Sequence, residues 1–329
     1  MVRILTRADV RQAVTMAEAI EAVQAAYVQL SAGEARVPVR LPVEVPEEDG
    51  VILYMPAYLP RSGGLGAKIV TVFPHNPQAG LPTIHALVVV NDARTGAPTA
   101  VMEAGYLTAL RTGAAAGVAT RLLARPDART AAIIGAGVQG RTQLEAIAAV
   151  RDLERAWVYD ANRTAAERFA AEMASRGGRV PRDVRVADTP QAAVRDADVI
   201  STATTSRQPV FADADLKPGV HINGIGSFTP DMQEIPPETV SRARIVVDNV
   251  AACLAEAGDL IIPLRQGLIN RDDMATEIGQ VAAGARPGRS QPDEITFFKS
   301  VGNAAQDVAV AQLVLARAPV LGLGVEVEL

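Results

Sequence analysis

Three glycines in the middle of the chain have the spacing of a phosphate-binding turn. Gly135, Gly137 and Gly140 stand in Ile-Ile-Gly-Ala-Gly-Val-Gln-Gly, at the end of an apolar run and the start of a predicted helix. In a strand-turn-helix unit the first glycine makes the tight turn, the second lets the backbone approach a pyrophosphate, and the third lets the helix pack on the strand. The helix start, at Val138 and Gln139, offers free N–H groups to the phosphates. The pattern therefore indicates binding of a dinucleotide.

An acidic residue follows at the position that such a turn requires. Asp160 ends the next apolar run, 20 residues after Gly140, where a carboxylate would bind the hydroxyls of a ribose. Asp160 favours NAD because its charge would repel the 2′-phosphate of NADP, whereas Asn162 and Arg163 just beyond it could favour NADP. The alternative for Arg163 is a solvated charge at a helix start. The sequence thus predicts NAD or NADP as cofactor, with NAD slightly favoured.

Two polar segments further along the chain are expected to complete the cofactor pocket. Each follows a short apolar run, so both should lie at the carboxyl edge of a parallel sheet, where such folds bind their ligands. The candidate cofactor residues in these segments are Thr202, Ala203, Thr204, Gly224, Gly226 and Ser227. The alternative for each segment is an ordinary polar loop.

Lys68 stands inside an apolar run that would normally exclude an ammonium group. A buried lysine is costly unless it is paired, and its pKa shifts readily, which suits it to proton transfer or to polarising a carbonyl or imine. The alternative is a lysine on an edge strand whose side chain reaches water. Because this chain uses arginine almost wherever it needs a cation, we single out Lys68 as a candidate catalytic residue.

Two arginines and one histidine are further candidates for a substrate site. Arg40 and Arg111 could each clamp a carboxylate, since a guanidinium binds one through two parallel hydrogen bonds; the alternative for either is a surface ion pair. His85 could donate a proton within reach of Lys68 if the strands that carry the two residues pair. The alternative for His85 is a hydrogen-bonded structural histidine.

Two kinds of domain are needed to position these residues. From residue 129 onward short apolar strands alternate with helices, which is typical of a doubly wound parallel sheet of the Rossmann type. Before it, a predicted helix over 15–31 precedes β-like segments between 37 and 102 and a helix over 106–123, which predicts a mixed α+β domain. We expect an α/β protein in which residues 119–299 form the Rossmann dinucleotide-binding domain. Residues 1–118 and 300–329 then form the substrate domain.

The composition excludes several classes of protein. A chain that is 49% hydrophobic and 21% charged is globular, and its net charge of −5 argues against nucleic acid as a partner. Its longest apolar runs fall far short of the roughly 18 residues of a membrane span. The first residues lack the apolar core of a secretory signal, and the single cysteine, Cys253, has no spacing suited to a metal site. We expect a cytoplasmic protein with no metal and no membrane partner.

These motifs, in this order, resemble those of the ornithine cyclodeaminase and mu-crystallin family. The resemblance covers essentially the whole chain, through Gly-Ala-Lys68-Ile-Val, Leu-Thr-Ala-Leu-Arg111-Thr-Gly, the glycine turn, Thr202-Ala-Thr-Thr-Ser, and Lys299-Ser-Val-Gly-Asn-Ala-Ala-Gln-Asp307. It implies an NAD(P)-dependent enzyme acting on a small amino or imino acid. It also implies that Lys68, Arg40 and Arg111 bind the substrate and that Thr112 lies near the cofactor phosphates. The expected assembly is a homodimer built through the N-terminal domain.

One segment departs from the pattern of the cyclodeaminases in this family. Those enzymes carry a catalytic aspartate two residues after a glycine, and here Gly226 is followed at that position by Phe228, which cannot exchange a proton. The segment is more similar to that of the imine-reducing members. Asp231 could act in place of the missing aspartate, and the alternative is that it caps a turn after Pro230.

The sequence therefore predicts NAD(P)H-dependent reduction of a small imino acid, such as pyrroline- or piperideine-2-carboxylate, by hydride transfer. Arg40 and Arg111 would hold the carboxylate, while Lys68 polarises the imine or donates a proton. The alternatives are ornithine cyclodeaminase, which releases proline and ammonia, and alanine dehydrogenase. A non-enzymatic alternative is a protein that uses NADPH to bind a small ligand.

Overall fold

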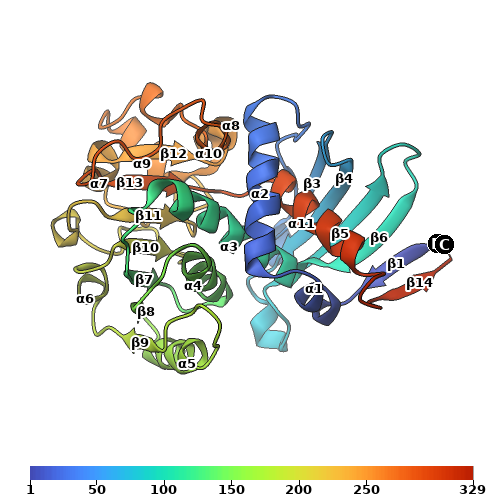
Figure 1. Cartoon of the computed structure of the whole chain (residues 1–329), viewed down its shortest axis with the longest axis horizontal. Coiled ribbons are helices and arrows are strands. Elements are labelled where there is room, and N and C mark those ends of the chain that lie inside the picture. Colours follow the sequence, from blue (N-terminus) through green and yellow to red (C-terminus); the bar gives the residue numbers. More distant parts are fainter. Residues whose placement is uncertain (329) are drawn as a thin grey trace. The chain divides into compact units, whose positions relative to one another are not determined.

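The computed structural model describes residues 1–328, and the chain divides into two compact units, each drawn in Figure 1. Unit 1 comprises residues 1–111 together with the chain from Asn303 onward, and unit 2 comprises Thr112–Gly302. The junctions expected from the sequence, after residues 118 and 299, fall a few residues from these. The first junction lies inside one helix, α3 (Ala104–Leu123).

Unit 1 is built on a seven-stranded mixed sheet with the order β14-β1-β6-β5-β4-β3-β2. Its strands are β1 (Val2–Leu5), β2 (Leu41–Val45), β3 (Gly50–Leu59), β4 (Gly64–Val72), β5 (Ile84–Asp92), β6 (Pro98–Glu103) and β14 (Val325–Val327). Only β1 and β6 pair in parallel, and the other neighbours are antiparallel. The expected mixed character is confirmed, although the short strands β1 and β14 carried too little alternation to be predicted.

Helices cover one face of this sheet. They are α1 (Arg7–Ala13), α2 (Met16–Ser31) and α11 (Ala304–Arg317), and α11 lies across β3, β4 and β5 and against α2 (Figure 1). Along β3, Met55, Ala57 and Leu59 are buried with Ala305 and Val308 of α11, as the two-residue period of a strand requires. Residues between them point to the other face.

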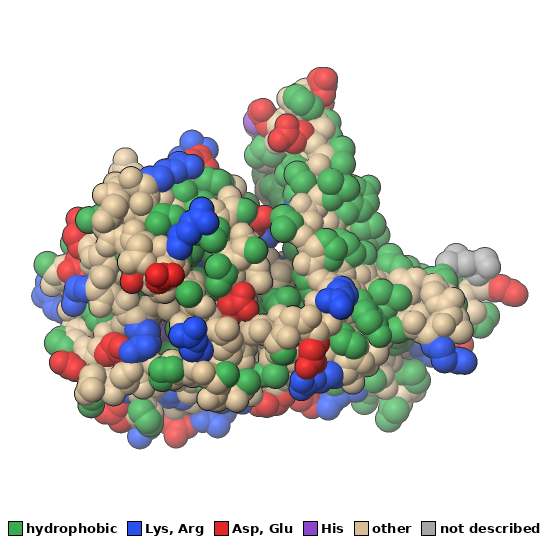
Figure 2. All heavy atoms as spheres, turned by 90° about the horizontal axis from the view of Figure 1, so that it is seen from above, with side chains coloured by type: hydrophobic (Ala, Val, Ile, Leu, Met, Phe, Trp, Pro, Cys, Tyr) green, Lys and Arg blue, Asp and Glu red, His purple; other side chains and the backbone are tan. Residues whose placement is uncertain are grey.

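That other face is apolar and open in the single chain. Tyr54 and Tyr58 of β3 are 40% and 37% exposed, and Leu41, Val43 and Leu87 are 62%, 47% and 49% exposed. The strand register places Leu41, Tyr54 and Leu87 in one row across the sheet. Figure 2 shows hydrophobic side chains gathered over this unit. We call these five residues the outer apolar face.

Unit 2 has a seven-stranded parallel sheet with the order β12-β13-β11-β10-β7-β8-β9. The strands are β7 (Thr130–Ile134), β8 (Arg155–Tyr159), β9 (Asp183–Val186), β10 (Val199–Thr202), β11 (His221–Gly224), β12 (Arg244–Val247) and β13 (Thr296–Lys299). The order reverses beside β7, because β8 lies on one side of it and β10 on the other. The predicted doubly wound sheet is confirmed, and a ligand of such a sheet binds at this reversal.

Helices pack on both faces of the parallel sheet. After α3 they are α4 (Val138–Val150), α5 (Arg163–Ala174), α6 (Pro190–Val194), α7 (Pro237–Arg242), α8 (Val250–Glu256), α9 (Gly258–Arg265) and α10 (Ile278–Ala282). Alternate residues of β7 belong to the two cores: Ala131 and Ile133 pack with α4 and α5, while Ala132 and Ile134 share a core with α6 to α9. A strand buried on both faces has to be apolar throughout, which explains the uninterrupted run before the glycines. Within residues 1–328, no helix is both long and apolar enough to span a membrane.

Candidate functional site

The glycine turn has the geometry that a phosphate-binding turn needs. Gly135 has a φ of 107°, in the left-handed region that favours glycine, and a Cβ there would lie 2.5 Å from the carbonyl oxygen of Ala203. A Cβ on Gly140 would lie 2.1 Å from the carbonyl oxygen of Gly135, so the helix can approach the strand only without one. By contrast, a Cβ on Gly137 would meet nothing within 4 Å. The backbone before α4 is therefore open to a ligand at Gly137.

A cavity of about 460 Å³ opens at this turn. It lies at the carboxyl ends of β7, β8 and β10, and its lining residues are Ile134, Gly135, Gly137, Tyr159, Asp160, Ala161, Ala203, Thr204, Thr205, Ser206 and Val210. Five predicted cofactor residues are thus brought together: Gly135, Gly137, Asp160, Ala203 and Thr204. The others lie outside the lining, namely Thr112, Val138, Gln139, Asn162, Arg163, Thr202, Gly224, Gly226 and Ser227.

Asp160 braces the turn as well as lining the cavity. One of its carboxylate oxygens accepts a hydrogen bond from the Ala136 N–H and the other from the Asn162 N–H, both at 2.8 Å. Asn162 caps α5 by accepting from the Ala165 N–H. Arg163 forms exposed ion pairs with acidic neighbours, including Asp188 at 2.7 Å. These surroundings fit the alternative interpretation of Arg163, a solvated charge at the start of a helix.

Of two further predicted residues, Thr112 contacts α4 and Gln139 belongs to it. The carbonyl oxygen of Thr112 accepts from the side-chain amide of Gln143, at 3.3 Å, and Gln143 in turn accepts from the Ser201 hydroxyl at the end of β10. The side-chain oxygen of Gln139 is buried and has no hydrogen-bond partner within residues 1–328. A buried acceptor without a donor is costly, so a ligand hydroxyl or amide that donates to Gln139 would be favoured.

Glu234, which no motif singles out, connects the two polar segments. Its buried carboxylate accepts five hydrogen bonds, from the hydroxyls of Thr202 (2.9 Å) and Thr204 (2.8 Å) and from the N–H groups of Thr204 (2.6 Å), Gly226 (2.7 Å) and Ser227 (3.1 Å). These donors lie at or just after the ends of β10 and β11, which are neighbouring strands. The partners lie up to 32 residues from Glu234 in sequence, so no local spacing could have revealed them.

A second buried carboxylate, that of Asp259, binds the backbone at Glu234. One oxygen of Asp259 accepts from the N–H groups of Glu234 (2.7 Å) and Ile235 (3.0 Å), and the other forms an ion pair with Lys299 at 2.9 Å. Asp259 and Lys299 are both completely buried. Burial raises the pKa of Glu234 and the charge of Asp259 adds to this, while Lys299 and the hydrogen bonds from Thr204 oppose it.

Lys68 is the centre of a separate cluster in unit 1. It lies on the helix-covered face of β4, and its ammonium nitrogen is 2.9 Å from one carboxylate oxygen of Asp307 on α11. The Nε of Arg111 donates to the other oxygen at 3.0 Å, and Arg111 also donates to Gln306. The side chain of Lys68 is only 2% exposed, so the alternative of a lysine that reaches water is wrong. Asp307 belongs to the motif that carries the resemblance, but its pairing with Lys68 was not predicted.

The cluster carries more positive than negative charge. Burial and, after it, the charges of Arg111 and Arg40 lower the pKa of Lys68 to about 7, although the ion pair with Asp307 opposes the shift. Arg40 is therefore close enough to act on Lys68 through its charge. At neutral pH the ammonium and the free amine of Lys68 are both well populated, as suits a proton donor.

The structure does not bring His85 to Lys68. The two strands do pair, but Thr71 lies opposite His85 and Val88 lies opposite Lys68. Because side chains alternate along a strand, a separation of three positions puts His85 on the other face of the sheet, where it is exposed. The expectation that His85 donates a proton next to Lys68 is wrong.

Asp231 lies in an exposed turn of unit 2. The Thr229 hydroxyl donates to its carboxylate at 2.6 Å, and Arg207 forms an ion pair with it at 3.2 Å. The hydrogen bond from Thr229 holds the pKa of Asp231 below its ordinary value, so the carboxylate is ionised at neutral pH and has no proton to give. These surroundings fit the turn-capping alternative, and we do not retain Asp231 as a proton donor.

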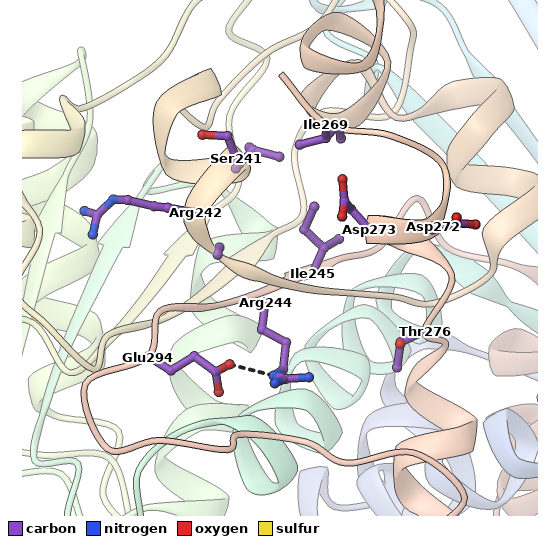
Figure 3. A pocket seen from close by; sticks show the side chains of 11 residues that line it. Ser241, Arg242, Arg244, Ile245, Ile269, Asp272, Asp273, Thr276 and Glu294 are labelled. Carbon is purple, nitrogen blue, oxygen red and sulfur yellow. Dashed lines mark hydrogen bonds and ion pairs between the residues drawn. The ribbon is translucent and has the colours of Figure 1, made fainter. Parts of the chain in front are cut away.

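A further cavity, of about 340 Å³, lies beside the edge strand β12 (Figure 3). Arg244, the first residue of β12, lines it and points toward Glu294, with which it forms an ion pair at 2.8 Å; Asp272 and Asp273 also line the cavity. Arg244 and Glu294 come at the amino ends of β12 and β13. The cavity is thus at the opposite edge of the sheet from the glycine turn, and ligands of such sheets bind at the carboxyl edge.

The parallel sheet, its reversal beside β7 and the glycine turn define the class: a Rossmann-type dinucleotide-binding protein with a second, mixed α/β unit. The match of a family model over residues 2–320 then makes the assignment specific, and the chain belongs to the ornithine cyclodeaminase/mu-crystallin family.

Three proteins are similar to this chain over almost its whole length. A Δ(1)-pyrroline-2-carboxylate reductase of Bacillus cereus is 40% identical over 326 residues, covering 99% of each chain. The structure of the Thermococcus litoralis Δ(1)-pyrroline-2-carboxylate reductase in complex with NADH and L-proline is 42% identical, with a TM-score of 0.95 over 99% of this chain and 100% of that one. An archaeal alanine dehydrogenase dimer with bound NAD is 38% identical, with a TM-score of 0.92 over 99% of each chain.

Proposed function

We propose that the chain reduces a small cyclic imino acid, pyrroline-2-carboxylate or its six-membered homologue, with NADH. The observation that carries the proposal is the buried Lys68–Asp307–Arg111 cluster, which combines a proton donor with a carboxylate-binding cation. Support comes from the glycine turn with Asp160 and from the similarity to proteins named pyrroline-2-carboxylate reductases.

The chain's own residues have distinct tasks in this reaction. A guanidinium has five N–H groups, so the bonds of Arg111 to Asp307 and Gln306 leave others to bind the substrate carboxylate, and Arg40 adds a second cation. The hydride for the imine carbon would come from NADH when it is bound. The Lys68 ammonium gives a proton to the imine nitrogen, which completes the saturated amino acid, and Asp307 keeps Lys68 in place.

The cofactor we propose is NAD rather than NADP. Each oxygen of Asp160 accepts one backbone hydrogen bond, and a carboxylate oxygen has a further lone pair that can accept from a ribose hydroxyl. The same negative charge would repel a 2′-phosphate. Arg163, the cation best placed in sequence to offset that repulsion, is paired with Glu167 and Asp188. We therefore expect a lower Kd for NADH than for NADPH.

A second copy of the chain is the proposed partner of the outer apolar face. A contiguous apolar surface of this kind marks a protein-protein interface, and residues in one row across a sheet can meet their own copies around a two-fold axis. The similarity to an alanine dehydrogenase described as a dimer supports this assembly.

A second candidate reaction is the reductive amination of pyruvate. The similarity to alanine dehydrogenase favours it, and the chemistry is close, because an acyclic imine next to a carboxylate would use the same cations and the same proton donor. The cyclodeaminase reaction is not favoured, because Phe228 stands where those enzymes carry their aspartate.

A panel of substrates separates these reactions. Pyrroline-2-carboxylate, piperideine-2-carboxylate, pyruvate with ammonium, and ornithine would each be supplied with NADH, NADPH and their oxidised forms, and consumption of reduced dinucleotide and release of ammonia measured. We expect the highest kcat/KM for a cyclic imine with NADH. Proline and ammonia formed from ornithine without net loss of dinucleotide would instead indicate a cyclodeaminase. Tight binding of NADPH with no turnover of any compound would indicate a binding protein.

A further inference from the structure

The carboxylate of Glu234 is shared between the ends of two neighbouring strands. One oxygen accepts from the N–H and the hydroxyl of Thr204, after β10, and the other accepts from the Thr202 hydroxyl and the N–H groups of Gly226 and Ser227, after β11. Both oxygens therefore face donors only. Glutamine has one accepting and one donating end, so its N–H₂ group would face at least one backbone N–H, either that of Thr204 or those of Gly226 and Ser227.

The backbone around Glu234 leaves no room for a side chain at two nearby glycines. A Cβ on Gly226 would lie 2.2 Å from the carbonyl oxygen of Thr204 and 2.5 Å from Glu234 Oε1, and a Cβ on Gly258 would lie 1.9 Å from the carbonyl oxygen of Met232. The two polar segments thus approach each other at Gly226, where Glu234 binds both, and Gly258 allows α9 to approach Met232. Asp259 fixes the backbone N–H of Glu234 from the other side.

The segment that Glu234 holds is also a wall of the cavity at the glycine turn. Ala203, Thr204 and Thr205 line that cavity together with Gly135 and Asp160. The carbonyl oxygen of Ala203 lies where a Cβ of Gly135 would be, so the turn and the segment are in direct contact. A displacement of Thr204 would therefore change the shape of the cavity and not merely a distant loop.

We propose that Glu234 is a positioning residue for the dinucleotide, whose carboxylate holds the backbone at residues 202–204 and 226–227 in the form that binds the cofactor. The inference rests on the proposed function, since it takes the cavity at the glycine turn as the NADH site. Glu234 does not line that cavity, so its effect on the cofactor passes through Thr204, which does.

The test compares Glu234→Gln with Glu238→Gln, a matched change of an exposed glutamate on the neighbouring helix α7. The Kd for NADH is measured from the change in NADH fluorescence on binding, and KM for pyrroline-2-carboxylate is measured at saturating NADH. We expect the Kd of Glu234→Gln to rise about 10- to 100-fold, as the loss of charge-assisted hydrogen bonds implies. KM for the imine should stay unchanged, and Glu238→Gln should match the wild type in both.

A milder variant keeps the test decisive if Glu234→Gln does not fold. Thr202→Val removes one of the five donors with little change of shape, and we expect a smaller rise of the NADH Kd in the same direction. A folded Glu234→Gln or Thr202→Val with wild-type affinity for NADH, or a loss that falls on the imine KM alone, would overturn the positioning role. A wild-type protein that binds neither dinucleotide would overturn the proposed function itself, which separates the two failures.

Discussion

At the scale of residues, one carboxylate controls the candidate substrate site. Asp307 binds Lys68 and Arg111 through its two oxygens, and it is completely buried. Without that charge two cations would face each other inside the protein, which is costly. With it, Lys68 remains able to hold a proton near neutral pH while Arg111 is kept in one orientation.

The first prediction concerns Asp307→Asn. Asp307 opposes the effect of burial on Lys68, so its neutral replacement should move the pKa of Lys68 below 7. Imine reduction needs the protonated form, so kcat/KM falls as the pH rises through this pKa, and the fall should begin at lower pH in Asp307→Asn. Removing one partner of a buried ion pair should also lower the free energy of unfolding by about 3–5 kcal/mol. An unchanged pH profile would contradict the role of Asp307.

Site residues whose partners are near in sequence could be predicted. Site residues whose partners are far away in sequence could not. Gly135, Gly137 and Asp160 belong to one strand-turn-helix-strand unit, so their arrangement follows from their order along the chain. Asp307 reaches Lys68 only because α11 packs on β4. The error at His85 has a similar origin, because strand pairing was predicted but the register, which decides the face, was not.

At the scale of elements, the carboxyl ends of β7, β8 and β10 hold the candidate cofactor site. Each strand end carries a polar or glycine-rich segment, and the three strands are neighbours in the sheet. The doubly wound sheet could be predicted because its strands are short apolar runs separated by helices. The hydrogen bonds and the ion pair by which Glu234, Asp259 and Lys299 hold the segments at the ends of β10 and β11 could not be predicted, because the three residues lie on different elements.

The second prediction contrasts two glycines of the turn. Gly137→Ala adds a methyl group that meets no protein atom within 4 Å, so the variant should fold with unchanged stability but should lose NADH affinity, because the methyl group occupies space left for the pyrophosphate. Gly140→Ala places a Cβ 2.1 Å from the Gly135 carbonyl oxygen and should lower the free energy of unfolding. Thermal unfolding and NADH titration of both variants are the measurements. Wild-type NADH affinity in Gly137→Ala would show that phosphates do not bind there.

At the scale of the whole molecule, the unit 1 sheet has one face packed under α2 and α11 and the other exposed. The two faces have different roles, because Lys68 lies on the first and the outer apolar face on the second. The homodimer that we propose would give the second face a partner. The size and position of this face could not be predicted without the register of β2 to β5.

The third prediction tests that assembly. Leu87→Glu places a charge on the outer apolar face, where its burial against a second copy would be unfavourable, so the variant should sediment as a monomer. Leu268→Glu is the matched control, since Leu268 in unit 2 is exposed to almost the same degree, 47% against 49%. If Leu87→Glu sediments as the wild type does, the face is not the dimer interface.

The central claim is that Lys68 gives the proton in a dinucleotide-dependent reduction, and one variant tests it most directly. Lys68→Met keeps the length of the side chain but removes its proton, and Lys217→Met is the control in unit 2. Turnover of pyrroline-2-carboxylate and the Kd for NADH would be measured on both variants. We predict that kcat/KM of Lys68→Met falls about 10²- to 10⁴-fold, as the loss of a general acid implies, while its NADH Kd is unchanged. Wild-type turnover by Lys68→Met would contradict the account.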